Sequence, residues 1–393
     1  MKKLLIVNNN LHIGGVQKAL LNLLDEIAGD YEITLLLFSD CGALRGRVPD
    51  GVRVITPRSP FRWWGLTRAD CKDLCSLLCR SFWAALTRTA GRPVSARLAG
   101  LFQKKLRGYD AAISYLHSGP PRAFYGGCCE FVLRCVETER KIAFLHCDYG
   151  AIGAECASNT RLYERFDRIA ACSEGCRTAF LRVLPQLAGK TVVIPNCQND
   201  RELSALAAQA PVPAEEGKLR LVTVARFGRE KAVPRAIRAV AALGDRARML
   251  RYDIIGDGAE YAQAEEMISA LGLEDTVFLH GELENPYGYV RAADVLLIPS
   301  VSEAAPLVIG EAARLGTPIL TTETSSAREL VGEAGLGWVC ENSEAGVCSG
   351  IGRLLSDPEE VKRKQESLRT ASFDNSDAVR RFAETVRELC TER

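Results

Sequence analysis

The sequence lacks long apolar stretches. None of its apolar runs approaches the roughly 18 residues that a membrane-spanning helix needs, and residues 4–7 are too few for the apolar region of a secretory signal. We therefore expect a cytoplasmic protein whose 15 cysteines stay reduced. The hydrophobic content of 47% and the charged content of 25% are ordinary for a globular chain of two or three domains.

Histidine is also scarce. Only four occur, at positions 12, 117, 146 and 280, which argues against a metal site built from histidines. Cys71, Cys75 and Cys79 recur every four residues but lack the spacing of a zinc knuckle. We interpret these cysteines as small apolar filler on one helix face, and we predict no metal site.

Short apolar segments alternate with amphipathic ones, which is typical of doubly wound α/β domains. The expected strands cover residues 3–8, 32–38, 52–55, 110–115, 141–146, 167–173, 192–194, 219–225, 276–281 and 294–299, with two more that start at 252 and 317. The segment 198–217 contains the proline-rich run 210–217 and indicates a linker. We therefore expect one domain over 1–197, a second over 218–374, and a final helix within 375–393.

Residues 300–311 carry the most informative pattern, because two glutamates follow an apolar strand. Pro306 suits the first turn of a helix, which would place Glu303 in the preceding loop and Glu311 within the helix. A helix that starts at the carboxyl end of a parallel strand is an anion site. Glu311 could then accept hydrogen bonds from a vicinal diol such as ribose. On this spacing alone, two ordinary surface glutamates are an equally good interpretation.

Two cations follow the first strand of the second domain. Arg226 and Lys231 flank a loop, as a pyrophosphate requires when no metal neutralises it. Either residue alone could form a surface salt bridge. Together with the two glutamates, the pair favours an anion-binding site.

The Glu303–Glu311 spacing resembles the donor-binding motif of the retaining glycosyltransferases of family four. That family has the GT-B fold, in which two Rossmann-like doubly wound domains face each other across a cleft. Five motifs occur here in the family's order: Gly14-Gly15, His146, Arg226 with Lys231, Gly256-Asp257-Gly258, and Glu303 with Glu311. The resemblance covers roughly residues 3–390 outside 44–107, and implies that the last helix crosses back onto the first domain.

The resemblance implies a role for each motif. Glu311 would bind the nucleotide ribose, Glu303 and His146 the donor sugar, and Arg226 and Lys231 the diphosphate. Gly14 and Gly15 would let the phosphates and the acceptor approach closely. Gly256, Gly258, Glu282 and Leu283 would border the nucleobase. Pro306, Leu307 and Val308 would begin the helix that faces the diphosphate.

One departure concerns the sugar pocket. The family usually has Glu-Gly-Phe after the first glutamate, whereas this chain has Glu303-Ala304-Ala305-Pro306. The variant resembles members of bacterial surface-polysaccharide pathways. It implies transfer from a nucleotide-diphosphate sugar, with UDP-sugars expected, to a glycan or lipid-linked acceptor with retention. No cofactor is expected, because the chain has no Asp-x-Asp metal motif.

Two other functions stay open. A GT-B nucleotide-sugar 2-epimerase would release a free sugar epimer without an acceptor. A non-catalytic nucleotide- or glycan-binding module would bind nucleotide without turnover. The ordered Glu303 and Glu311 motif favours a transferase over both.

Residues 44–107 interrupt the strand–helix rhythm with 14 Lys/Arg against three Asp/Glu. Leu74, Leu77, Leu78, Phe82 and Leu86 fit one helical stripe, and Trp63, Trp64 and Trp83 could lie at lipid headgroup level. This pattern predicts contact with an anionic membrane surface, here the inner face of the cell membrane, through exposed cations that include Arg80, Arg88, Arg92 and Arg97. A solvated helix packed on the sheet is the alternative. Nucleic acid is not an expected partner, because no binding motif accompanies the charge.

Overall fold

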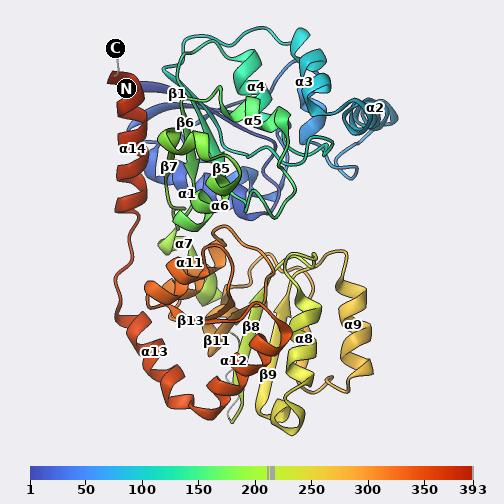
Figure 1. Cartoon of the computed structure of the whole chain (residues 1–393), viewed down its shortest axis with the longest axis vertical. Helices are drawn as coiled ribbons and strands as arrows, with labels where there is room; N and C mark the ends of the chain where they lie inside the picture. Colours follow the sequence, from blue (N-terminus) through green and yellow to red (C-terminus); the bar gives the residue numbers. More distant parts are fainter. Residues whose placement is uncertain (210–211, 213–216, 392–393) are drawn as a thin grey trace. The chain divides into compact units, whose positions relative to one another are not determined.

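The computed structural model describes residues 1–209, 212 and 217–391 (Figure 1). The chain divides into two compact units, one formed by Met1–Cys197 with Asn375–Arg393 and the other by Gln198–Asp374. Each unit contains a parallel sheet with helices, as expected for each domain of the GT-B fold predicted from the sequence. No helix among the described residues has both the length and the apolar character that a membrane crossing requires.

The first unit is built on seven parallel strands in the order β3-β2-β1-β4-β5-β6-β7. Their bounds are β1 Lys2–Asn8, β2 Tyr31–Leu37, β3 Arg53–Ile55, β4 Ala111–Ser114, β5 Lys141–Leu145, β6 Arg168–Ala171 and β7 Thr191–Val193. The central strand β1 places Leu4 opposite both Ile33 and Ala111. Leu4, Leu5, Ile6 and Val7 are all buried, because helices cover both faces of a parallel sheet.

Seven helices accompany this sheet among the described residues: α1 Gly15–Ile27, α2 Leu74–Ala90, α3 Arg92–Leu101, α4 Cys128–Cys135, α5 Ala157–Tyr163, α6 Glu174–Val183 and α14 Ser376–Thr391. Short 3-10 segments also occur, η1 Ala43–Arg47, η2 Pro60–Gly65 and η3 Pro185–Lys190. The C-terminal helix α14 belongs to the first unit and contacts α1. Its Phe382 is buried and meets the ring of Tyr31 edge-on at 5.9 Å.

The basic tract 44–107 forms η1, β3, η2 and the helix pair α2 and α3, which lie side by side (Figure 1). The predicted positions of two tryptophans are wrong. Trp64 and Trp83 are 3% and 8% exposed, because Trp64 packs in an aromatic cluster with Phe61 and Phe124 and Trp83 lies on the buried face of α2. Trp63 is half-buried under Arg62.

Two of the four arginines expected at the surface are instead bound to other parts of the chain, and one of them is fully buried. Arg92 is fully buried and its Nε donates to Glu130 at 2.6 Å. Arg80 is partly buried and donates to the Leu66 carbonyl at 2.7 Å. Arg88 and Arg97 are exposed, as predicted.

The cysteine interpretation is also wrong in part. Cys71 precedes α2 and is only half-buried, and Cys75 is exposed on the helix. Neither fills a core. The helix instead turns Trp83, Ala84 and Thr87 inward.

The second unit has six parallel strands in the order β10-β9-β8-β11-β12-β13. Their bounds are β8 Leu219–Val224, β9 Leu250–Ile255, β10 Val277–Leu279, β11 Val295–Ile298, β12 Ile319–Thr322 and β13 Gly337–Cys340. Helical segments accompany it: α7 Asp200–Gln209, α8 Val233–Ala241, η4 Gly244–Met249, α9 Tyr261–Ala270, α10 Tyr287–Ala292, α11 Leu307–Arg314, the π-helical η5 Arg328–Glu333, α12 Glu344–Ser356 and α13 Pro358–Thr370.

The segment 198–217 that we expected to be a linker begins with a helix. Leu203 and Ala207 recur at helical spacing in α7 and are buried with Tyr287 of α10. The proline-rich part of that expected linker falls largely on residues 210–211 and 213–216, which lie outside the described residues.

The strand order reverses once in each sheet, between β1 and β4 and between β8 and β11. Ligands of open parallel sheets bind beyond the carboxyl ends of the strands at such a reversal. We therefore expect a ligand site at the loops that follow these four strands.

Candidate functional site

The reversal in the second unit brings together the loops that follow β8 and β11. The Val301 amide donates to the Glu230 carbonyl at 2.8 Å, which joins the two loops by their backbones. The Asn342 side chain donates to the carbonyls of Val301 and Glu323, both at 2.9 Å. The loops are thus fixed by hydrogen bonds that do not use the candidate site residues.

Lys231 and Glu303 meet at this point. Lys231 Nζ lies 2.6 Å from Glu303 Oε1, with side chains only 25% and 11% exposed. Ser300 Oγ donates to the same oxygen at 2.7 Å. Ser325 Oγ donates to the Glu303 carbonyl at 2.7 Å, which fixes the main chain as well as the side chain. The fold holds a cation and a carboxylate together at the sheet reversal.

Arg226 lies on the same loop as Lys231 but has a different partner. Its guanidinium is 75% exposed and donates to Glu230 at 2.7 Å. Burial disfavours the Glu230 carboxylate, but the hydrogen bond from Arg226, a backbone hydrogen bond and the charges of Arg226 and Lys231 together lower the pKa of Glu230. Arg226 can therefore turn toward an incoming anion without leaving a buried charge unpaired.

The residue after Lys231 has an unfavourable backbone conformation. Ala232 has φ of 50°, the one positive value for a non-glycine among the described residues. The left-handed conformation costs an L-residue about 1–2 kcal/mol. Ala232 is the N-cap of α8, so this bend ends the Lys231 loop and starts the helix. Such strain often accompanies functional loops.

Gly256 and Gly258 bring the loop after β9 against the loop after β8. They have φ of 139° and 153°, and an added Cβ would lie 1.9 Å from the Ala225 oxygen and 2.6 Å from the Phe227 oxygen, respectively. The fold itself therefore requires both glycines. Glu282 follows β10, the strand next to β9, and is exposed, whereas Leu283 packs against an apolar cluster of this unit.

Glu311 lies inside α11, as the sequence predicted. It is 7% exposed and accepts a hydrogen bond of 2.8 Å from the Tyr287 hydroxyl. Pro306 is the N-cap rather than a residue of the first turn, so the helix begins at Leu307, followed by Val308. The Gln198 side chain donates to the Leu307 carbonyl at 3.1 Å and packs on Gly310.

In the first unit, Gly14 and Gly15 mark the start of α1. Gly14 is the N-cap with an extended backbone, and an added Cβ at Gly15 would meet nothing within 4 Å. Neither the backbone conformation nor the packing at Gly15 requires glycine. The space beside Gly15, at the start of α1 and next to the strand-order reversal, is therefore open.

His146 follows β5 directly, at the carboxyl edge of the same sheet. Its ring lies 4.7 Å from that of Tyr115 at a tilt of 41°, and burial together with the neighbouring His117 lowers the pKa of His146 to about 3. Burial and the Arg92 charge lower the pKa of His117 to about 4. Both imidazoles are therefore neutral at physiological pH. His146 Nε2 and His117 Nδ1 have no hydrogen-bond partner in the part of the chain that the structure describes.

The structure thus pairs Lys231 with Glu303 directly, and gives Arg226 and Glu311 other partners. Sequence reasoning missed the partners themselves: Glu230, Tyr287, Ser300 and His117. Glu230 and Ser300 lie within a few residues of predicted positions and could have been inferred. Tyr287 begins helix α10 and His117 lies in the loop after β4, and no sequence spacing signals them.

Comparison with known proteins agrees with this geometry. Residues 207–370 match the family model described as "Glycosyl transferases group 1". The amylovoran biosynthesis glycosyltransferase AmsK of Erwinia amylovora is 30% identical over 184 residues, covering 44% of this chain and 45% of that protein. The putative colanic acid biosynthesis glycosyltransferase WcaL of Escherichia coli is 32% identical over 145 residues, covering 34% and 35%. The chain thus matches half or less of the length of these two relatives.

Among solved structures, Anabaena Alr3699/HepE in complex with UDP and glucose superposes with a TM-score of 0.69 at 18% identity, covering 99% of this chain and all of that one. WaaG, a glycosyltransferase involved in lipopolysaccharide biosynthesis, superposes with a TM-score of 0.63 at 14% identity, covering 99% and 100%. At these identities the likeness concerns the fold.

Proposed function

We propose that this chain, which carries a glycosyl transferases group 1 domain over residues 207–370, is a glycosyltransferase that moves a sugar from a nucleotide-diphosphate sugar to a glycan or lipid-linked acceptor. The observation that carries the proposal is the Lys231–Glu303 pair at the strand-order reversal of the second unit. It offers a cation for a diphosphate and a carboxylate for sugar hydroxyls in one place.

The second unit would bind the donor. Lys231 and Arg226 would stabilise the charge that develops on the departing diphosphate, and the N–H groups at the start of α11 would add to this. Glu311 would accept hydrogen bonds from the ribose. The Tyr287 hydroxyl occupies one carboxylate oxygen of Glu311 and fixes its orientation for a diol.

The first unit would contribute His146 to the donor sugar, and the Gly14-Gly15 turn to the phosphates and the acceptor. A neutral imidazole suits a hydrogen bond to a hydroxyl group, and His146 Nε2 has no partner within the described residues. The acceptor would attack from the face that the diphosphate leaves, so that the product retains the anomeric configuration. We assign no protein nucleophile.

We further propose a UDP-sugar donor and a place in bacterial surface-polysaccharide synthesis. The relatives AmsK and WcaL are named for polysaccharide biosynthesis, and a structural neighbour was solved with UDP and glucose. We assign the chain to the cytoplasm, at the inner membrane face, with no nucleic-acid partner.

Donor chemistry would need no metal, because Lys231 and Arg226 supply the charge. Added Mg²⁺ or Mn²⁺ should therefore leave the transfer rate unchanged. A rate that falls with EDTA and returns with either of these ions would contradict this part of the proposal.

The exposed residues of α2 and α3 support the membrane part of the proposal. Leu74, Leu78 and Phe82 lie on one face of α2 and are 70%, 60% and 61% exposed. On α3 and just after it, Leu101 and Phe102 are 75% and 69% exposed. An apolar row beside exposed arginines is the composition of an interfacial surface, and charge complementarity assigns it to an anionic bilayer.

The deciding experiment is a donor screen. The purified chain is incubated with UDP- and GDP-sugars, and released nucleotide is measured with and without lipid-diphosphate-linked sugars. Nucleotide release that requires an acceptor supports the transferase, and the anomeric configuration of the product, read by NMR, tests retention. Epimer formed without acceptor would identify an epimerase, and binding without turnover a non-catalytic module. A chain that binds no nucleotide sugar overturns the proposal.

A further inference from the structure

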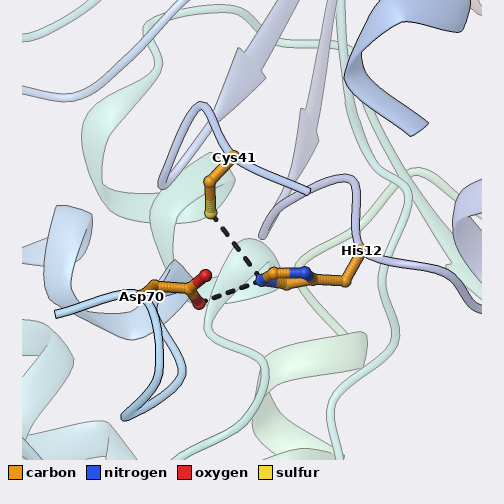
Figure 2. Close-up of side chains that lie close together, drawn as sticks. All are labelled: His12, Cys41 and Asp70. Atoms are coloured by element: carbon orange, nitrogen blue, oxygen red, sulfur yellow. Dashed lines mark hydrogen bonds and ion pairs between the residues drawn. The ribbon is translucent and has the colours of Figure 1, made fainter. Parts of the chain in front are cut away.

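Three potential metal ligands from three separate loops converge in the first unit (Figure 2). His12 follows β1, Cys41 follows β2, and Asp70 lies between η2 and α2. His12 Nε2 is 2.9 Å from Asp70 Oδ2 and 3.8 Å from Cys41 Sγ. All three ligand atoms lie within 4.8 Å of one another.

Backbone hydrogen bonds hold the first two loops together. The Leu11 amide donates to the Cys41 carbonyl at 2.9 Å, and the Leu44 amide donates to the Leu11 carbonyl at 3.0 Å. Gly42 has φ of 114°, and an added Cβ there would lie 2.2 Å from the His12 nitrogen. The approach of His12 to Cys41 is therefore part of the fold.

The third loop is held just as firmly. Asp70 Oδ2 accepts from the Thr67 amide at 2.7 Å and from Thr67 Oγ1 at 2.6 Å. The Asn10 side chain donates to the Gly65 carbonyl at 2.6 Å, which ties this segment to the loop of His12. Ligand positions that are fixed before an ion arrives lower the ordering cost of binding.

We propose that His12, Cys41 and Asp70 form a zinc site. Imidazole nitrogen, thiolate sulfur and carboxylate oxygen are the ligands that Zn²⁺ takes in proteins, and three of them leave the fourth tetrahedral position for water. Zinc–ligand bonds of about 2.0–2.3 Å place ligand atoms roughly 3.3–3.7 Å apart in that geometry. The observed separations of 2.9 and 3.8 Å lie close to this range, so small shifts suffice.

The chemistry of the cluster also suits a dication. A bound Zn²⁺ ion would take Cys41 as the thiolate and displace the thiol proton to solvent. Arg45 pairs with Asp40 and leaves the Asp70 carboxylate to the cluster. The His12 and Asp70 side chains are 36% and 16% exposed, so an ion can reach them from solvent.

The site would connect the loop of the first strand to the basic tract. His12 is two residues from Gly14 in sequence, and Asp70 lies three residues before Asp73, the N-cap of α2. A bound zinc ion would fix the Gly14-Gly15 turn relative to the segment that we assign to the membrane. This inference goes beyond the proposed transferase activity and does not depend on it.

The experiment measures zinc binding to the full chain after chelation and buffer exchange. Competition with a chromophoric chelator gives stoichiometry and affinity, and Co²⁺ substitution reports thiolate ligation through its charge-transfer absorption. We expect one tight zinc per chain and a thiolate–Co²⁺ band. Cys41→Ser and His12→Gln should each weaken zinc binding on the order of 100-fold and, for Cys41→Ser, abolish the band.

Cys75→Ser is the matched control, because Cys75 is an exposed thiol on α2 outside the cluster. It should bind zinc like the wild type. Circular dichroism checks that each variant is folded, and the wild-type titration is decisive even where a variant is not. A wild-type chain that binds no zinc, or tight zinc that survives both Cys41→Ser and His12→Gln, would overturn the proposal and leave an ordinary His12–Asp70 hydrogen bond.

Discussion

Lys231 Nζ lies 2.6 Å from Glu303 Oε1, so the cation expected to meet the diphosphate is already paired with the carboxylate expected to meet the sugar. The partners lie 72 residues apart and come from loops on either side of the strand-order reversal. An arriving diphosphate would share Lys231 with Glu303. In the proposed reaction the pair would therefore link departure of the diphosphate to the position of the sugar-binding group.

Removing Lys231 should strongly impair transfer. We expect Lys231→Ala to lower kcat/KM about 100-fold, or about 3 kcal/mol, the usual effect of losing one strong electrostatic donor. Arg226→Ala should lower kcat/KM by a smaller factor, and that factor should shrink as salt rises, because Arg226 is largely exposed. Arg229→Ala is the control, since Arg229 is exposed on the same loop. Steady-state kinetics test this, and a Lys231→Ala rate within threefold of wild type would remove Lys231 from the site.

Glu311 should control nucleotide binding. Glu311→Ala removes the expected ribose acceptor and should weaken nucleoside diphosphate binding at least tenfold. Tyr287→Phe removes only the hydroxyl that orients the carboxylate, so its effect should be smaller, about 1 kcal/mol. Calorimetric titration with UDP measures both. Equal binding by Glu311→Ala and wild type would show that Glu311 is only a structural partner of Tyr287.

Stability should depend on pH through His117 and His146, which are half-buried. In the folded chain the pKa values of His146 and His117 are about 3 and about 4, against 6.5 for an unperturbed histidine. The unfolded chain therefore binds more protons between about pH 4 and 6.5, and the free energy of unfolding should fall as the pH falls through that window. Denaturant titrations of wild type and of the His117→Gln/His146→Gln double variant measure this. If the double variant keeps the full wild-type dependence of unfolding free energy on pH, the lowered pKa values of these two histidines would be contradicted.

One arginine of the basic tract should be essential for stability. Arg92 is buried against Glu130 and donates further to the carbonyls of Gly119 and Pro120. Arg92→Gln should cost about 3–5 kcal/mol, because it leaves a buried carboxylate without its cation. Arg97→Gln, on the same helix but exposed, should change stability by less than about 0.5 kcal/mol. Urea denaturation compares the two, and equal stabilities would show that the Arg92–Glu130 pair contributes nothing net.

The sequence predicted the fold well because apolar runs such as 4–7 and 295–298 are long enough to identify buried parallel strands. It also placed Glu303 and Glu311 correctly in the loop and the helix, since Pro306 marks where α11 begins. Strand β13 was missed, because Gly337 begins it and its side chains are only half-buried. Helix α7 was missed because prolines follow it closely.

Contacts between distant loops could not be predicted. The basic tract shows why, because charge and aromatic content do not say which side chains face inward. Trp64 and Arg92 look like surface residues by composition, but Trp64 packs between Phe61 and Phe124 and Arg92 joins the tract to Glu130 of α4. His12 and Asp70 likewise stand 58 residues apart and meet only after the tract has folded over the first loop.

The remaining prediction concerns membrane binding by α2 and α3. The sequence suggested tryptophans as anchors, but the structure buries Trp64 and Trp83 and exposes Leu78 and Phe82 instead. The row of aliphatic and aromatic side chains should therefore enter the headgroup region, while exposed arginines meet anionic lipid. We expect binding to vesicles that contain anionic phospholipid, little binding to neutral vesicles, and loss of binding as salt rises.

Variants can separate the two contributions. Each cation near an anionic surface contributes about 1 kcal/mol, so Arg88→Gln with Arg97→Gln should lower the partition coefficient roughly 30-fold. Leu78→Ser with Phe82→Ser should also reduce binding, but equally at low and high salt, because it removes apolar contact alone. Arg248→Gln with Leu271→Gln alters comparably exposed residues of the second unit and serves as the control. Vesicle co-sedimentation at several salt concentrations measures all three. If the wild type ignores anionic vesicles at low salt, the apolar row is a solvated helix face, and the acceptor must be delivered without the help of this surface.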